Sequence, residues 1–150
     1  MSGETHLFKL HTSYAGGSKG DGIASATGTD VAYSLPPELG GEPGRTNPEQ
    51  LLLASVAACY SLTLSVLAER KRLPFVKVEV NAEGAVIVQP GGTLKYTSIK
   101  LTPTITMDNA DETQLKSMED FAHKAELYCP ISGALRGNVE VTVEPNIING

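Results

Sequence analysis

The chain has 150 residues, of which 41% are hydrophobic and 19% are charged, and its formal net charge is −5. This composition is that of an ordinary soluble globular protein, and we expect a single domain over residues 1–150. The negative charge and an aromatic content of 5% argue against a nucleic-acid partner, which requires a basic surface and stacking side chains.

The N-terminal segment Met1–Thr5 has neither a basic region nor an apolar run, so we expect no signal peptide and a cytoplasmic location. Residues 51–68 are uncharged and reach the lower length limit of a membrane span. Hydroxyl side chains interrupt that run, however, and alanine is frequent in it. We therefore expect a buried core helix there and no membrane partner.

The first third of the chain predicts strands and turns. Phe8, Leu10 and Tyr14 share one parity, as in a half-buried strand that starts near residue 6. A glycine-rich turn at 16–22 precedes a second strand of small residues at 23–33. A loop rich in proline and glycine follows.

A long helix is predicted to begin at Pro48, because Asn47 is a good N-cap and Gln50 stands at the capping-box position. We expect the helix to run to about Lys71. It is apolar on nearly all sides, so a sheet should cover one side of it and a partner subunit another.

The second half of the chain predicts a hairpin, a helix and a final strand. Apolar and polar residues alternate over 76–83, and a Pro-Gly-Gly turn leads to a second strand over 99–107. Asp108 or Asn109 is expected to cap an amphipathic second helix. A short helical turn after Cys129 and a strand over residues 139–144 complete an α+β fold.

Cys59 and Cys129 are the only cysteines, and in a reducing compartment a disulfide between them would be transient and catalytic. A thiol peroxidase needs one thiolate to attack the peroxide and a second thiol to condense with the sulfenic acid. The alternative is that both cysteines are inert, buried side chains. From the residues alone, Cys129 is favoured as the nucleophile because it precedes a helix N-terminus, with Cys59 as its resolving partner.

Glu49 is a further candidate, as a carboxylate that orients a cation or the peroxide, although acidic residues are common in any first helical turn. Ten residues along a helix span about 15 Å, so Glu49 cannot touch Cys59 on the same straight helix. We expect it to reach the thiol of a neighbouring subunit.

Two other kinds of site are disfavoured. The three histidines, His6, His11 and His123, lack metal-ligand spacing with the cysteines, so we expect no metal site. The glycine-rich stretch at 16–20 lacks the spacing of a phosphate-binding loop and is followed by a strand rather than a helix.

Three stretches of the sequence are more specific. They are Thr-Asn-Pro-Glu-Gln-Leu-Leu at 46–52 with Ala-Ala-Cys at 57–59, Cys-Pro-Ile-Ser at 129–132 with Ala-Leu-Arg-Gly-Asn-Val at 134–139, and Leu-Pro-Pro-Glu-Leu-Gly-Gly at 35–41. Together they resemble the OsmC/Ohr family of osmotically inducible and organic hydroperoxide resistance proteins. The third stretch is similar to the Ohr branch of that family.

The resemblance implies an intertwined α+β homodimer with N-terminal strands, a long buried central helix, a β-hairpin, a second helix and a C-terminal strand, with active sites at the subunit interface. It also implies a peroxidase that reduces organic hydroperoxides to alcohols, holds no cofactor and is re-reduced by an external dithiol such as a lipoyl group. Apolar walls formed by Leu51, Leu52, Val56 and the second helix would favour alkyl or lipid hydroperoxides.

Carried over residue by residue, the resemblance makes Cys59 the peroxidatic cysteine and Cys129 the resolving one, joined in a Cys59–Cys129 disulfide. It makes Glu49 the carboxylate that positions a catalytic arginine. This order of the two cysteines is the reverse of the one that the helix dipole favours.

One departure concerns the arginine. The Ohr branch carries a Gly-Arg-Asp-Gly-like turn, whereas the matching stretch here is Gly-Ser-Lys-Gly-Asp-Gly at 17–22, and no arginine precedes Arg45. Lys19, as a point charge, and Arg45 are the candidates to replace it. The departure leaves two alternatives open: a module that binds a small hydrophobic or thiol ligand at the dimer interface without turnover, and a structural dimer whose cysteines only pack.

Overall fold

The structure, a computed structural model, describes residues 3–150. The segment Met1–Thr5, in which no signal peptide is expected, therefore lies partly outside the described residues. The chain divides into two compact units, Met1–Leu51 and Leu52–Gly150. The single domain over residues 1–150 therefore stays a prediction.

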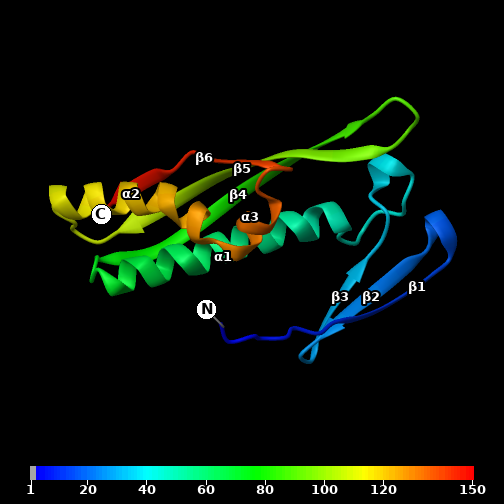
Figure 1. Ribbon diagram of the computed structural model, residues 1–150, viewed down its shortest axis with the longest axis horizontal. Helices are drawn as coiled ribbons and strands as arrows, with labels where there is room; N and C mark the ends of the chain where they lie inside the picture. Colours follow the sequence, from blue (N-terminus) through cyan, green and yellow to red (C-terminus); the bar gives the residue numbers. More distant parts are fainter. Residues whose placement is uncertain (1–2) are drawn as a thin grey trace. The chain divides into compact units, whose positions relative to one another are not determined.

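The first unit contains a three-stranded antiparallel sheet in the order β1-β2-β3. Its elements are β1 (His11–Ala15), the 3-10 turn η1 (Gly17–Lys19), β2 (Asp21–Ala26), β3 (Thr29–Tyr33) and the 3-10 turn η2 (Pro37–Leu39). Figure 1 shows η1 joining β1 to β2 and η2 in the loop that leads to the first α-helix.

Two predictions for this unit are wrong. The single strand expected over 23–33 is a hairpin, because Thr27 and Gly28 have φ values of 51° and 76°, the positive values of a type I′ turn. The strand expected from residue 6 begins only at residue 11, and Phe8 is 94% exposed rather than half-buried.

The helix α1 (Pro48–Arg70) begins at the residue that the capping signals predicted and ends one residue before the predicted Lys71. Asn47 Oδ1 accepts the backbone N–H of Gln50 at 2.8 Å, which satisfies one of the free donors of the first turn. The Gln50 side chain accepts a hydrogen bond from the Thr46 hydroxyl at 3.1 Å instead of completing the capping box. The start of α1 is thus fixed by local side chains.

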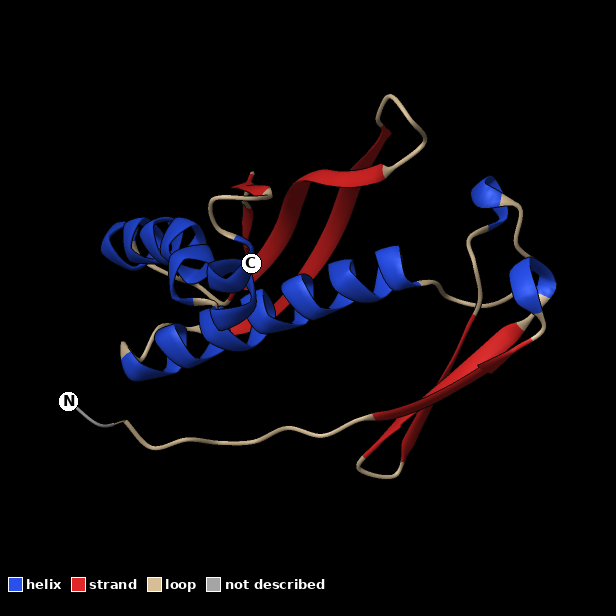
Figure 2. Cartoon of the chain, turned by 45° about the vertical axis from the view of Figure 1, so that its right-hand side comes forward, coloured by secondary structure: helices blue, strands red, loops and turns tan. Residues whose placement is uncertain are grey.

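The second unit is built on a sheet whose central strand is β5 (Leu94–Met107). The strand β4 (Phe75–Val88) pairs antiparallel with β5, as the Pro-Gly-Gly turn predicted, while β6 (Glu140–Val143) and β7 (Asn146–Asn149) pair parallel with its other edge. The sequence pattern did not predict β7. Figures 1 and 2 show α1 lying along one face of this sheet.

The helix α2 (Glu112–Tyr128) packs on the same core. It is capped by Asp111, not by Asp108 or Asn109, because Asp111 and Gln114 form a reciprocal capping box. The short helix α3 (Pro130–Leu135) follows at once, so that Cys129 ends α2 and begins α3. The α+β architecture is therefore as predicted.

Within residues 3–150, the buried side chains of α1 form one stripe. The buried residues of the helix recur every fourth position: Val56, Tyr60, Leu64 and Ala68. Leu62, on another face, is 69% exposed. Within residues 3–150, α1 is the one helix that is long and apolar enough to span a membrane, and 22% of its most apolar window is buried. The central helix expected to be buried is thus buried along one face.

Candidate active site

The fold brings the two cysteines together, although 70 positions separate them in the sequence. Cys59 lies in the middle of α1, Cys129 lies at the junction of α2 and α3, and the two thiols are close enough for each to shift the pKa of the other. Both are free thiols. Cys59 is half-buried, whereas Cys129 is only 1% exposed. Two sulfhydryls in such contact can form a disulfide with little rearrangement.

Cys59 is held in place by its neighbour in α1. The fully buried Tyr60 donates its hydroxyl to the carbonyl of Ala122 on α2, at 2.5 Å. Burial raises the pKa of Tyr60 far above its ordinary value, so its hydroxyl stays protonated as a donor. Because Cys59 immediately precedes this anchor, the thiol lies at the edge of the buried stripe, on the side of Cys129.

Cys129 is the N-cap of α3 and supplies the capping acceptor with its own sulfur. Cys129 Sγ accepts the backbone N–H of Ser132 at 3.4 Å. The buried hydroxyl of Ser132 makes no well-aligned hydrogen bond, but it lies within reach of the same sulfur. A thiolate on Cys129 would give that hydroxyl the acceptor it lacks.

The surroundings separate the proton affinities of the two thiols. Burial and the contact with Cys129 raise the pKa of Cys59, against weaker hydrogen bonds from the Ile131 backbone and the Thr63 side chain. Burial also disfavours ionisation of Cys129, but hydrogen bonds from Cys59 and Ser132 outweigh it and lower the pKa of Cys129. These hydrogen bonds, rather than a helix dipole, are what favour a thiolate at Cys129 in the described chain.

An ion pair closes the turn that carries Cys129. Arg136 Nη2, just after α3, lies 3.5 Å from Glu126 Oε1 in the last turn of α2. The backbone N–H of Cys129 donates to the carbonyl of Glu126 at 3.3 Å. Sequence reasoning missed this pair, although Arg136 belongs to one of the three specific stretches.

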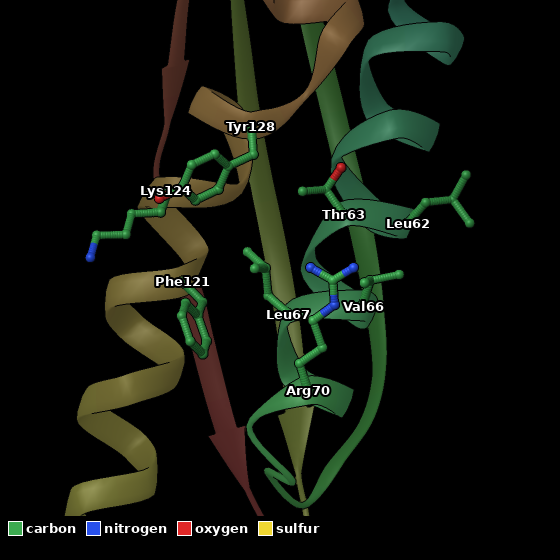
Figure 3. Close-up of a pocket in the computed structure, with 8 residues that line it drawn as sticks. All are labelled: Leu62, Thr63, Val66, Leu67, Arg70, Phe121, Lys124 and Tyr128. Atoms are coloured by element: carbon green, nitrogen blue, oxygen red, sulfur yellow. The ribbon is translucent and has the colours of Figure 1, made fainter. Parts of the chain in front are cut away.

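An apolar groove of about 560 Å³ lies between α1 and α2 (Figure 3). Its lining is Leu62, Thr63, Val66, Leu67, Arg70, Phe121, Lys124 and Tyr128. Thr63, one turn after Cys59, belongs both to the groove and to the surroundings of the thiol. The expectation that Val56 forms a wall is wrong, because Val56 is fully buried in the core.

Charge in the groove comes from Arg70. Figure 3 shows its guanidinium over the apolar floor, while the amine of Lys124 turns away from it. Lys124 instead pairs with Asp120 on α2 at 2.8 Å. The groove therefore combines an apolar surface, the guanidinium of Arg70 and, at Thr63, a residue that also borders Cys59.

The other predicted site residues lie in the first unit. Glu49, in the first turn of α1, lines a cavity of about 200 Å³ together with side chains of β1, β3 and the loop before α1. Lys19 Nζ donates to the Gly40 carbonyl at 2.8 Å and lies 3.8 Å from Glu42. Arg45 is 3.0 Å from Asp21. Each candidate cation thus has an acidic partner.

No group of three or more histidine, cysteine or acidic side chains within residues 3–150 is placed to hold a metal ion. What the site offers chemically is a pair of touching thiols with unequal acidity and unequal access. Such a pair can be oxidised to a disulfide and reduced again.

Comparison with known proteins identifies relatives along nearly the whole chain. Residues 40–144 match the family model described as OsmC-like protein. An organic hydroperoxide resistance protein of Xanthomonas axonopodis pv. citri is 33% identical over 144 residues, which cover 95% of this chain and 96% of the relative.

Two solved structures are similar in sequence and in fold. An organic hydroperoxide resistance protein from Legionella pneumophila is 29% identical, with a TM-score of 0.74 over 95% of this chain and 99% of that one. A structure from Vibrio cholerae, with captopril bound in one of its active sites, is 25% identical, with a TM-score of 0.73 over 97% of this chain and 96% of that one.

Proposed function

The chain belongs to the OsmC/Ohr family, and we propose that it is a thiol-dependent peroxidase that reduces organic hydroperoxides to alcohols. The observation that carries the proposal is the contact between the free thiols of Cys59 and Cys129. Relatives that span the same length are named for organic hydroperoxide resistance, which supports this substrate class.

The difference in access assigns the roles of the two cysteines. An alkyl peroxide can approach the half-buried Cys59 but not Cys129, which is enclosed. Cys59 thiolate attacks the distal peroxide oxygen, the O–O bond breaks, and the alkoxide takes a proton and leaves as the alcohol. The lower pKa of Cys129 suits its role as the thiolate that attacks the resulting sulfenic sulfur, releasing water and forming the Cys59–Cys129 disulfide.

The Cys59 thiolate requires a cation, because burial raises the pKa of this thiol. We assign that role to an arginine of the neighbouring subunit, Arg45, oriented there by Glu49, since a guanidinium can bind a carboxylate with two hydrogen bonds and still face a thiolate. Lys19 is the second candidate for this role. Both assignments replace the arginine that the Ohr branch carries in its glycine-rich turn.

Exposed apolar side chains support an intertwined homodimer; its cytoplasmic location is proposed from the sequence alone. Leu62 and Val66 on α1, and Phe8 and Leu10 before β1, are large apolar residues that the single chain leaves exposed. A second subunit would cover them and roof the groove beside Cys59. The apolar groove then favours alkyl or lipid hydroperoxides over hydrogen peroxide.

An external dithiol, such as a lipoyl group, would return the disulfide to two thiols. The Vibrio cholerae relative binds captopril, itself a thiol, in one of its active sites, which supports access for a thiol to the same place in this chain. No bound cofactor is required by these steps.

The test is turnover of cumene hydroperoxide with dithiothreitol as the reductant. We expect steady consumption of peroxide by the protein and none above background by Cys59→Ser; undiminished turnover by that variant would overturn the proposal. Cys129→Ser is the matched variant, which in the absence of dithiothreitol should react once with peroxide and then stop at the sulfenic acid. One equivalent of peroxide should remove both thiols of the unaltered protein and lower its mass by about 2 Da, the two hydrogens lost on disulfide formation.

The alternative function is a module of the same fold that binds a small hydrophobic or thiol ligand at the dimer interface without turnover. The absence of an arginine before Arg45 and the size of the groove favour it. In that case both thiols would survive one equivalent of cumene hydroperoxide.

A further inference from the structure

The two sulfurs of the site differ in how an incoming thiol can reach them. Cys59 is half-buried and lies beside the groove between α1 and α2 through its contact with Thr63. Cys129 is 1% exposed, and Ser132 lies against its sulfur. In thiol–disulfide exchange the rate depends on which sulfur is accessible and on how well the other sulfur leaves as a thiolate.

We propose that reduction of the Cys59–Cys129 disulfide has a fixed direction: the dithiol attacks Cys59 Sγ, and Cys129 leaves as a thiolate stabilised by Ser132. The inference deepens the proposed function, because it concerns the disulfide assigned there. It makes Ser132 a positioning residue for the leaving sulfur.

The electrons and protons of the exchange balance as follows. One thiolate of the dithiol forms a bond to Cys59 Sγ, and the electron pair of the Cys59–Cys129 bond passes to Cys129 Sγ. The second thiol of the reductant then loses its proton and attacks the first sulfur of the reductant, which is bonded to Cys59 in the mixed disulfide. This attack expels Cys59 as a thiolate. The dithiol loses two electrons and becomes a cyclic disulfide, and its two protons remain on the two cysteines.

The position of Ser132 suits a thiolate that leaves at Cys129 better than it suits the protonated thiol. Its backbone N–H already donates to Cys129 Sγ at 3.4 Å, and its hydroxyl is buried without a well-aligned partner. A buried hydroxyl without an acceptor destabilises the folded protein, whereas a thiolate at Cys129 accepts from both donors at once. Charge that develops on Cys129 therefore meets two preplaced donors.

The opposite direction is disfavoured on both counts. Attack on Cys129 Sγ would require the reductant to enter an enclosed position. It would also expel Cys59, whose thiol has a raised pKa and is therefore the poorer leaving group. Access and leaving-group stability thus both favour attack of the reductant on Cys59 Sγ.

The experiment maps the mixed disulfide in the full-length protein. The disulfide is formed with diamide, so that the test does not depend on peroxidase activity, and is then exposed briefly to the monothiol 2-mercaptoethanol. Acid quenching, alkylation with N-ethylmaleimide and peptide mass mapping locate the two labels. We expect the mercaptoethanol adduct on Cys59 and the maleimide on Cys129.

An adduct on Cys129, an even division between the two cysteines, or failure of diamide to form the disulfide would overturn the inference. Loss of peroxide turnover with the adduct still on Cys59 would instead contradict the proposed function alone. The two failures are therefore distinguishable.

Ser132→Ala tests the leaving group directly. The variant removes the hydroxyl but keeps the backbone N–H, and we expect its diamide-formed disulfide to be reduced by dithiothreitol about tenfold more slowly. Ser98→Ala, which removes a half-buried hydroxyl from β5, is the matched control and should be reduced at the unaltered rate. Equal rates for the two variants would remove Ser132 from the mechanism.

Discussion

The hydroxyl of Tyr60 donates to the backbone carbonyl of Ala122 at 2.5 Å inside the core, and this bond ties the helix that carries Cys59 to the helix that leads to Cys129. The two thiols come from elements that are distant in the sequence, so their contact depends on how α1 and α2 pack. A single buried hydrogen bond next to Cys59 is therefore part of what aligns the redox pair.

Tyr60→Phe should disturb the alignment of Cys59 and Cys129 without altering either thiol. Loss of one buried hydrogen bond should lower the free energy of unfolding by about 0.5–1.5 kcal/mol, measured by urea denaturation. Disulfide formation after diamide should become slower, because α1 and α2 are less firmly held. Ser98→Ala, which removes a half-buried hydroxyl from β5, is the control and should change neither quantity. Identical results for the two variants would contradict this role for Tyr60.

The acidity of the coupled thiols gives a second prediction, with opposite signs at the two positions. Cys59→Ala removes a hydrogen-bond donor from Cys129 and should raise the pKa of Cys129 toward the ordinary thiol value. Cys129→Ala removes two causes that raise the pKa of Cys59, so that this pKa should fall although burial remains. Ultraviolet titration of the thiolate in the two variants and the unaltered protein measures both shifts, and shifts of the same sign would contradict the coupling.

The pKa shifts of Cys129 and Cys59 make the free energy of unfolding depend on pH. The pKa of Cys129 is lower in the folded protein than in the unfolded chain, so its thiolate adds stability at a pH above the ordinary thiol pKa. That contribution is lost as the pH falls through the folded-state pKa. Cys59, with its raised pKa, acts in the opposite sense: its contribution is present below the ordinary thiol pKa and is lost as the pH rises through the folded-state value.

Local signals in the sequence predicted most of the fold. The cap at Asn47 set the start of α1, and the Pro-Gly-Gly turn set the hairpin of β4 and β5, because both features act within a few residues. The failures have equally local causes. Three acidic or amide residues near the start of α2 are all acceptable caps, and only the partner Gln114 selects Asp111. A Thr-Gly pair is a weak turn signal, so the break between β2 and β3 was missed.

The site was less predictable, because its chemistry depends on burial. The sequence favoured a thiolate at Cys129 through the helix dipole, whereas hydrogen bonds from Cys59 and Ser132 are what lower the pKa of that thiol. It could not show that Cys129 is enclosed and Cys59 is accessible, and this difference assigns their roles in the proposed mechanism. Nor could it show Ser132 against the sulfur, since a serine three residues after a cysteine carries no such signal by itself.

The cation of the proposed peroxidase is tested by two parallel substitutions. Arg45→Met should lower the second-order rate constant for cumene hydroperoxide by about tenfold or more, the effect of removing a charge-assisted hydrogen bond. Lys19→Met should have a smaller effect, because an amine is a point charge that cannot hold a carboxylate with the two hydrogen bonds of a guanidinium. Stopped-flow measurement of the first turnover gives both values. A larger loss for Lys19→Met would transfer the role to Lys19.

The exposed face of α1 supplies the test of the proposed homodimer. Leu62 is 69% exposed in the single chain, so a charged side chain there should cost the monomer almost nothing. If a second subunit covers this face, Leu62→Glu places a charge in an apolar interface and should convert the dimer to a monomer. Light scattering coupled to size-exclusion chromatography measures the mass. Because the groove beside Cys59 would lose its roof, we expect turnover of cumene hydroperoxide to fall with the loss of the dimer.

A matched variant separates this effect from a general response to surface charge. Val88, at the end of β4, is 70% exposed, and Val88→Glu should leave the dimer and its turnover intact. A Leu62→Glu protein that keeps both the dimeric mass and full turnover would show that α1 is not the interface. A monomer with full turnover would show that the site is complete within one chain, and Glu49, about 15 Å along α1 from Cys59, would then have no direct role at the thiol.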